Sequence, residues 1–179
     1  MKQVLGLDID GVLADWLAAV QVVAYREHGL DVMKHFTSWW PKKSVISALL
    51  RNFVDDIEFY RSLVPVNRAA WGVKQLTVSF DNIFYVTHRP STTRNITDEW
   101  LKRWSFPEYD VVIPRGPKLV SAKRLGITHF VDDRPRTVVE MREAGIVAYL
   151  FQCHDVPMIP TSTVIRDWVT LVSTLSLRR

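Results

Sequence analysis

The sequence predicts an α/β fold in which a doubly wound parallel sheet carries a small helical cap, inserted after the first strand. Three observations predict it. Short apolar runs alternate with helical patterns along most of the chain. Each run ends in polar residues, and ligands of such sheets bind beyond the carboxyl ends of the strands. After the first run comes a stretch of roughly 50 residues, which is too long for an ordinary connection between a strand and a helix.

The first strand is expected at Val4–Ile9, a mostly apolar run that ends in acidic residues and a glycine. Runs of this kind suit parallel strands, which helices cover on both faces. Four further runs complete the predicted sheet: Ile83–Val86, Val111–Ile113, His129–Val131 and Val147–Phe151. Helices are predicted between and after these strands, at Arg68–Phe80, Thr97–Trp104, Leu119–Leu125, Pro135–Ala144 and Val164–Leu177.

Residues 14–67 are expected to form the cap over the site, and residues 1–13 and 68–179 the α/β core. Within the cap, helical patterns occur at Trp16–His28 and Val45–Phe53. The aromatic stretch Phe36–Pro41 separates them. Internal repeats and low-complexity segments are absent from the sequence.

Composition limits the class of protein. Hydrophobic residues make up 47% and charged residues 23% of the 179 residues, as in ordinary folded proteins. The net charge of +4 is compatible with anionic small molecules or nucleic acid, and proves neither. Cys153 is the single cysteine, which excludes an intramolecular disulfide and a multi-cysteine zinc site. Since no apolar run reaches the roughly 18 residues of a membrane span, we expect a cytoplasmic protein without a membrane partner.

Acidic residues at the strand ends are the strongest local signal. Asp8 and Asp10 precede Gly11 at the end of the first run, and Asp132 and Asp133 follow another. A cluster of carboxylates repels itself unless a cation is present, and oxygen ligands suit Mg²⁺. A single aspartate in such a place would more often cap a helix or a turn. The convergence of several, together with a lysine and a threonine, favours a site.

These residues carry a family resemblance. The stretch Asp8-Ile9-Asp10-Gly11-Val12-Leu13 resembles the first motif of the haloacid dehalogenase-like (HAD) phosphohydrolases. Thr87 is similar to the second motif and Lys118 to the third, and Phe130-Val131-Asp132-Asp133 is similar to the fourth. The four motifs occur in the family's order and span most of the chain. The resemblance implies a Rossmann-like core of HAD type.

The resemblance also implies catalytic roles. Asp8 would attack phosphorus and form an aspartyl-phosphate, and Asp10 would protonate the leaving oxygen and then activate water. Thr87 would donate a hydrogen bond to the phosphoryl group. Lys118 would neutralise charge on that group and on Asp8. Lys123 competes for the third motif, but Lys118 is preferred because it starts the predicted helix near the strand ends.

The implied cofactor is Mg²⁺. Its expected ligands are Asp8, the backbone carbonyl of Asp10, and Asp132, with Asp133 orienting them from behind.

A narrower resemblance points to the 5'(3')-deoxyribonucleotidase branch. That branch often continues its first motif as Ala14-Asp15-Trp16 does here, and its cap returns through a segment much like residues 58–66. Aromatic residues of the cap enclose the nucleoside there. Trp16, Trp39 and Trp40 are the candidates, although packing in the core remains an alternative for each. Four other tryptophans occupy helical positions and are expected in the core: Trp71, Trp100, Trp104 and Trp168.

The chain departs from that branch after Thr87. His88 and Arg89 stand where the nucleotidases usually carry small residues. His88 is a candidate to touch the phosphate or the leaving group, against the alternative that it fills the mouth of the site. Arg115 is a candidate phosphate contact or an exposed arginine.

Cys153 and its neighbour His154 follow the last predicted strand. Because a metal site needs further ligands nearby, a packed cysteine and a surface histidine are expected instead.

The expected substrate is a small phosphate monoester, most simply a nucleoside monophosphate. One alternative is a polynucleotide 3'-phosphatase, which would need an open basic approach for a nucleic-acid end; another is a phosphatase for a different small ester. A catalytically silent HAD-like binding protein is the alternative outside the enzymes. The sequence leaves open whether the chain forms a homodimer.

Overall fold

A single sheet of six parallel strands forms the centre of the protein, in the order β3-β2-β1-β4-β5-β6. The computed structural model describes residues 2–33, 53, 56–154 and 164–176. The order reverses at β1, as in a doubly wound sheet, so the predicted fold class is confirmed. The strands are β1 Val4–Leu7, β2 Asn82–Val86, β3 Val111–Val112, β4 His129–Asp132, β5 Val147–Phe151 and β6 Val164–Ile165.

Most helices lie close to the predicted positions, with ends that differ by a few residues, but residues 57–62 form a helix that was not predicted. The helices are α1 Trp16–His28, α3 Ile57–Ser62, α4 Ala69–Leu76, α5 Arg94–Arg103, α6 Lys118–Arg124, α7 Pro135–Glu143 and α8 Trp168–Ser176. A short 3₁₀ turn, Ser91–Thr93, precedes α5. Among the described residues, no helix is both long enough and apolar enough to cross a membrane.

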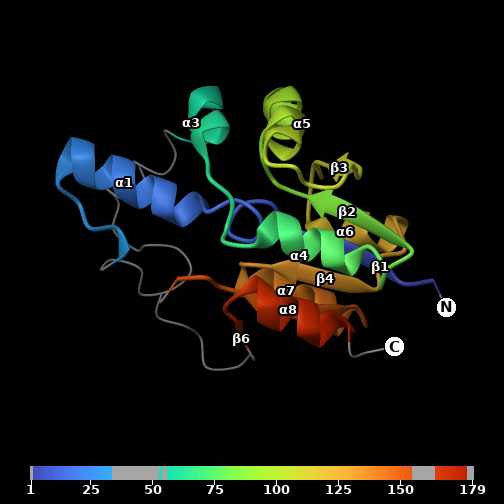
Figure 1. Cartoon of the computed structure of the whole chain (residues 1–179). Coiled ribbons are helices and arrows are strands. Elements are labelled where there is room, and N and C mark those ends of the chain that lie inside the picture. The colour runs from blue at the N-terminus through green and yellow to red at the C-terminus, as the bar shows by residue number, and fades with distance from the viewer. Residues whose placement is uncertain (1, 34–52, 54–55, 155–163, 177–179) are drawn as a thin grey trace.

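The two faces of the sheet are buried in two separate hydrophobic clusters. Along β2, Ile83 and Tyr85 belong to the larger cluster, and Phe84 and Val86 belong to the smaller one. The larger cluster contains residues of α4, α5 and α8, whereas the smaller one contains residues of α6 and α7. The alternation follows from the two-residue period of a strand, and it explains why consecutive residues of a strand such as β2 are apolar. Figure 1 shows α4 and α8 side by side on one face.

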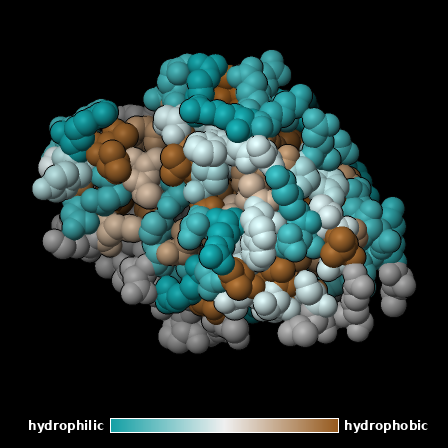
Figure 2. Space-filling model, viewed as in Figure 1, coloured by the Kyte–Doolittle hydropathy of each residue, from teal (hydrophilic) through white to brown (hydrophobic). Residues whose placement is uncertain are grey.

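The surface on this side of the molecule is mixed. Figure 2 shows small groups of hydrophobic residues scattered among hydrophilic ones. Such scattering is ordinary for a folded protein, whose surface always retains apolar atoms.

The prediction for the C-terminal segment is wrong at its start. Val164 and Ile165 do not begin a helix but pair with Leu150 and Phe151 as an edge strand. The helix begins at Trp168 instead, after Asp167, whose carboxylate accepts a hydrogen bond from the backbone N–H of Thr170 at 2.9 Å. Two β-branched residues next to an open sheet edge favour pairing over helix formation.

The predicted cap is described only in part. Its first helix is found as α1 at the predicted residues, and α1 extends away from the sheet (Figure 1). The predicted helix Val45–Phe53, apart from Phe53, and the aromatic stretch Phe36–Pro41 lie outside the described residues. The division into a core and a cap over residues 14–67 therefore stays a prediction.

Tryptophans anchor the connections to the core. Trp100 and Trp168 are buried as predicted, and Trp104 is partly buried. The indole N–H of Trp100 donates to the Leu63 carbonyl at 2.7 Å, and that of Trp168 donates to the Val12 carbonyl at 3.0 Å. The prediction for Trp71 is wrong, because this side chain lies 43% exposed on the outer side of α4.

The contact between α4 and α8 depends on a glycine. A Cβ atom at Gly72 would lie 2.2 Å from Cε3 of Trp168, whose side chain is fully buried. The absent side chain lets the two helices pack closely enough to bury the indole.

The variant Gly72→Ala tests this packing. Alanine is the better helix former by about 1 kcal/mol, but the new methyl group overlaps a ring that cannot move. We expect a net loss of about 1–3 kcal/mol in the free energy of unfolding, measured by urea denaturation. Gly116→Ala is the control, because a Cβ atom there meets nothing within 4 Å. Unchanged or increased stability of Gly72→Ala would contradict the account.

Candidate active site

Three carboxylates meet at the carboxyl ends of β1 and β4. Asp8 directly follows β1, Asp132 ends β4, and Asp133 comes next. One carboxylate oxygen of each lies within 4.8 Å of the others. The two strands are neighbours, and the backbone N–H of Asp8 donates to the Val131 carbonyl at 3.0 Å. The parallel pairing therefore brings together residues more than a hundred positions apart in the chain.

Lys118 joins two of these carboxylates. Its ammonium Nζ lies 2.6 Å from Oδ2 of Asp8 and 2.8 Å from Oδ2 of Asp132, and its side chain is 1% exposed. Burial works to lower the pKa of Lys118, but the Asp132 and Asp8 carboxylates outweigh it and raise that pKa above the usual value. Lys123 is exposed in the last turn of α6 and forms no ion pair with any residue that the structure describes. The geometry thus favours Lys118 as the residue of the third motif.

The positive charge of Lys118 does not fully offset the burial and mutual repulsion of the three carboxylates. Burial, together with the charge of Asp132, raises the pKa of Asp8 to about 7 against the lowering effect of Lys118. Burial also raises the pKa of Asp133 well above its ordinary value, with Asp8 and Asp132 adding to the shift. A divalent cation among these oxygen atoms would remove the repulsion, and an all-carboxylate donor set is one that Mg²⁺ prefers. The residues present therefore fit Mg²⁺.

The loop after Asp8 folds tightly against this cluster. The backbone N–H groups of Leu13 and Ala14 both donate to the Ile9 carbonyl at 2.8 Å. Gly11 has a φ of +83°, and a Cβ atom there would lie 2.2 Å from Oδ2 of Asp133. Only glycine fits both the left-handed conformation and the space. This explains the glycine of the first motif.

Thr87 is buried at the carboxyl end of β2, next to β1 in the sheet. Its backbone N–H donates to the Val112 carbonyl at 3.0 Å, which fixes the end of the strand. Its hydroxyl accepts a hydrogen bond from the backbone N–H of Arg89 at 3.2 Å. The hydroxyl hydrogen stays available to donate to another group.

Arg89 holds the side chain of Asp10, and sequence reasoning did not assign it a role. Nε lies 3.1 Å and 2.9 Å from the two carboxylate oxygens of Asp10, and Nη2 lies 2.6 Å from Oδ1. The remaining nitrogen, Nη1, donates to the Thr97 hydroxyl at 3.2 Å. Asp10 itself is 24% exposed, and these contacts with Arg89 fix the orientation of its carboxylate.

Aromatic rings enclose the guanidinium of Arg89. Its central carbon lies 4.7 Å from the ring centre of Tyr60 and 5.8 Å from that of Trp100. The side chain is fully buried, so these rings and Asp10 replace water around the charge. The available signal was the unusual arginine two residues after Thr87, but its partner could not be inferred without the fold.

The predicted substrate-binding residues that the structure describes differ in their exposure to solvent. His88 is exposed, with Nε2 3.0 Å from the Gly116 carbonyl oxygen, and partial burial lowers its pKa. Arg115 is exposed. Trp16 is partly buried, and its ring meets Phe59 edge to face with ring centres 6.3 Å apart. Trp39 and Trp40 lie outside the described residues.

A second group of polar side chains lies where β5 ends and α1 begins. The prediction of a surface histidine is wrong, because Nε2 of His154 lies 2.6 Å from Oδ1 of Asp15 and the side chain is 25% exposed. The hydrogen bond with Asp15, followed by the Cys153 side chain, raises the pKa of His154 to about 10. The imidazole is therefore protonated at neutral pH and forms an ion pair with Asp15.

The sequence matches a family model over residues 2–158, described as "5' nucleotidase, deoxy (Pyrimidine), cytosolic type C protein" (NT5C). The chain belongs to this family. A protein of Chlorobaculum tepidum named "Putative 5'(3')-deoxyribonucleotidase" is 25% identical over 162 residues, which cover 83% of this chain and 78% of that protein.

This 5' nucleotidase family member shares its fold with several solved structures. A HAD-like protein from Agrobacterium tumefaciens has a TM-score of 0.65 at 16% identity, covering 99% of each chain. The HAD hydrolase YfnB from Bacillus subtilis, solved bound to magnesium, has a TM-score of 0.64 at 16% identity, covering 97% of this chain and 98% of that one. The L-2-haloacid dehalogenase from Xanthobacter autotrophicus has a TM-score of 0.63 at 11% identity, covering 100% of each chain. The family match identifies a nucleotidase, which is a phosphatase, and the solved structures show that its fold is that of HAD-like hydrolases.

The role of Arg89 in orienting the Asp10 carboxylate can be tested with Arg89→Lys. Lysine keeps the charge but cannot contact both oxygens through a planar fork. We expect kcat for an aryl phosphate to fall by about 10- to 100-fold, as for other groups that orient a reacting side chain, with KM little changed. The control is Arg136→Lys, since Arg136 is 92% exposed and pairs only with Glu140 among the described ion pairs. Wild-type kcat in Arg89→Lys would exclude the positioning role.

Proposed function

We propose that this 5' nucleotidase family member is a Mg²⁺-dependent 5'(3')-deoxyribonucleotidase that acts through an aspartyl-phosphate. The observation that carries the proposal is the position of Lys118 between Asp8 and Asp132. It provides positive charge where a buried carboxylate would have to approach a phosphate dianion. The family match and the curated relative supply the substrate class.

Asp8 is the proposed nucleophile. Its Oδ1 accepts a hydrogen bond from the backbone N–H of Ile9 at 2.7 Å, and Oδ2 faces Lys118. These contacts fix the carboxylate at the strand end. One of its oxygens would form a bond to phosphorus while the ester P–O bond breaks, and the leaving alkoxide would take a proton from Asp10. Asp10 would then accept a proton from water, whose oxygen attacks phosphorus and releases phosphate and Asp8.

Two other groups would stabilise the phosphoryl group during both steps. The hydroxyl of Thr87 still has its hydrogen available, and its strand end adjoins that of Asp8. Lys118 would offset the charge that accumulates on the transferring oxygens.

Mg²⁺ would be held by the carboxylates of Asp8 and Asp132 and by the backbone carbonyl of Asp10, with Asp133 beside them. When bound, the ion supplies charge neutralisation at the phosphate oxygens. The acidic donor set supports this assignment, and the magnesium in the YfnB structure shows that a protein of this fold binds the ion.

Deoxyribonucleoside monophosphates are the proposed substrates. Trp16, Trp39 and Trp40 are retained as candidates for stacking on the base, and His88 and Arg115 as candidates for contacts near the phosphate. A cytoplasmic location and the oligomeric state stay predictions.

The chemical core is tested with Asp8→Asn. The amide cannot act as the nucleophile, so phosphate release from an aryl phosphate should fall by at least about 1,000-fold. Removing metal with EDTA should abolish the wild-type activity, and added Mg²⁺ should restore it. Asp98→Asn is the matched control, because Asp98 is an exposed carboxylate that pairs with Arg94 on α5. Full activity of Asp8→Asn would overturn the mechanism.

The substrate class is tested by phosphate release from deoxyribonucleoside and ribonucleoside 5'- and 3'-monophosphates, beside 3'-phosphorylated oligonucleotides. The proposal expects the highest kcat/KM with deoxyribonucleoside monophosphates, and rates that vary little with salt. A preference for the oligonucleotides, with activity that falls steeply as salt rises, would identify a polynucleotide 3'-phosphatase instead.

A further inference from the structure

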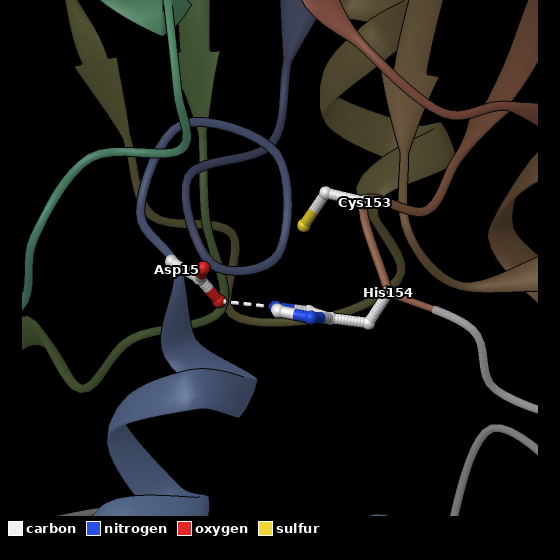
Figure 3. A group of neighbouring side chains, drawn as sticks. All are labelled: Asp15, Cys153 and His154. Atoms are coloured by element: carbon white, nitrogen blue, oxygen red, sulfur yellow. Dashed lines mark hydrogen bonds and ion pairs between the residues drawn. The ribbon is translucent and has the colours of Figure 1, made fainter.

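A sulfur, a nitrogen and an oxygen donor converge outside the acidic cluster. One potential metal-ligating atom each from Cys153, His154 and Asp15 lies within 4.8 Å of the others. Figure 3 shows the thiol, the imidazole and the carboxylate around one common space. Asp15 lies 139 positions before His154 in the chain, so the fold alone creates this group.

The backbone on both sides of the group is held in place. Asp15 begins α1, where its Oδ1 accepts from the backbone N–H of Ala18 at 3.1 Å, and its own N–H donates to the Val64 carbonyl at 2.9 Å. On the other side, Gln152 donates through its backbone N–H to the Ile165 carbonyl of β6 at 2.9 Å. The chain bends directly after β5, which turns two consecutive side chains toward the same space.

This donor set differs in chemistry from the acidic cluster. Asp8, Asp132 and Asp133 offer only oxygen atoms, which suit Mg²⁺. A thiolate, an imidazole and a carboxylate together suit a softer ion, and Zn²⁺ binds all three kinds of ligand. The ligand atoms of a tetrahedral Zn²⁺ site lie about 3.3–3.6 Å apart, given bonds of about 2.0–2.3 Å. The 2.6 Å contact between His154 and Asp15 would therefore have to open by about 1 Å or less.

We propose that Asp15, Cys153 and His154 form a Zn²⁺ site with three protein ligands. The ion takes the place of the hydrogen that Nε2 of His154 donates to Asp15, and the thiol of Cys153 loses its proton. Two protons therefore leave for each Zn²⁺ bound. Oδ2 of Asp15 takes part in neither the contact with His154 nor the cap of α1, so it can bind the ion while Oδ1 keeps the cap.

The fourth coordination position has room for a water or an anion. All three ligands line a cavity of about 410 Å³ whose wall also contains Arg68, Arg166 and Asp167. Three protein ligands with an accessible fourth position are typical of exchangeable or reactive zinc, whereas structural zinc has four protein ligands.

Cobalt is a direct probe of this site, because tetrahedral Co²⁺ is coloured and its bond to a thiolate gives a near-ultraviolet charge-transfer band. Co²⁺ is titrated into the full chain after EDTA treatment and desalting. Cys153 is the single cysteine of the sequence, so a charge-transfer band has one possible source. The expected result is saturation at one equivalent, with loss of the band when Zn²⁺ is added and no change with Mg²⁺ alone. In the absence of cobalt, Zn²⁺ should raise the thermal midpoint of the wild-type chain.

Four variants separate a site from a lone thiol. Cys153→Ser should abolish the band and the thermal shift. Asp15→Asn keeps an N-capping side chain, and His154→Gln keeps a partner for Asp15, so both should fold. Each should weaken Co²⁺ binding by at least about 10-fold, because even the loss of a residue that only supports a metal ligand typically costs about 10- to 100-fold in affinity. His28→Gln is the control, because His28 is exposed at the end of α1 and should leave the titration unchanged.

The proposal is overturned if the wild-type chain shows no charge-transfer band with one equivalent of Co²⁺. It is overturned equally if the band keeps its affinity in Asp15→Asn and His154→Gln, which would indicate binding by an isolated thiol. Asp132→Asn should lose phosphatase activity and keep the band, so the result for zinc does not depend on the proposed function.

Discussion

The contact of Lys118 with Asp8 and Asp132 is the constraint on which the site depends. Two of the three carboxylates at the ends of β1 and β4 are buried, since Asp8 is only 4% exposed and Asp132 is fully buried. Removing charges from water costs several kcal/mol for each ion unless opposite charges compensate. The ammonium group compensates part of this cost, and its place at the first residue of α6 ties that helix to both strands. The side chain of Lys118 therefore holds α6 against the two strands and also provides the positive charge of the site.

Two carboxylates separated by a single residue have different surroundings in this protein. Asp8 is buried and faces an ammonium group, whereas Asp10 is partly exposed and is held by the guanidinium of Arg89. The difference arises from the tight loop at Gly11, which takes the chain away from the strand direction after Asp8. Different surroundings are how two identical functional groups come to perform different tasks in one site. The enclosure of Arg89 by Tyr60 and Trp100 extends this arrangement into α3 and α5.

The carboxyl edge of the sheet collects two donor sets of contrasting chemistry. The oxygen atoms of the acidic cluster lie at the ends of β1 and β4, and the mixed donors of Asp15, Cys153 and His154 lie between the end of β5 and the start of α1. Residues 8–15 run from one set to the other, so a single loop carries a member of each. Hard and soft ligands sort metal ions by chemistry, which lets two sites in one small protein select different ions.

Local pattern was enough to predict the sheet, its parallel strands and the acidic residues, because each depends on a run of neighbouring residues. Val4–Leu7, Ile83–Val86 and Val147–Phe151 are apolar on both faces, which is typical of buried parallel strands in a layered fold. Likewise, Asp8, Asp10 and Asp132 stand at strand ends, where parallel pairing must gather them. The ends of elements were predicted less accurately. Val164 was predicted to begin a helix but lies in an edge strand, because its pairing with Leu150 depends on a neighbour distant in sequence.

Contacts between distant segments could not be inferred in this way. Nothing near Arg89 in the sequence indicates that it holds Asp10, 79 positions away, and nothing near His154 indicates Asp15. In each case the two partners carry opposite charges, and their attraction acts only once folding has placed them side by side. Sequence pattern specified which side chains reach the edge of the sheet, whereas packing in three dimensions selected their partners.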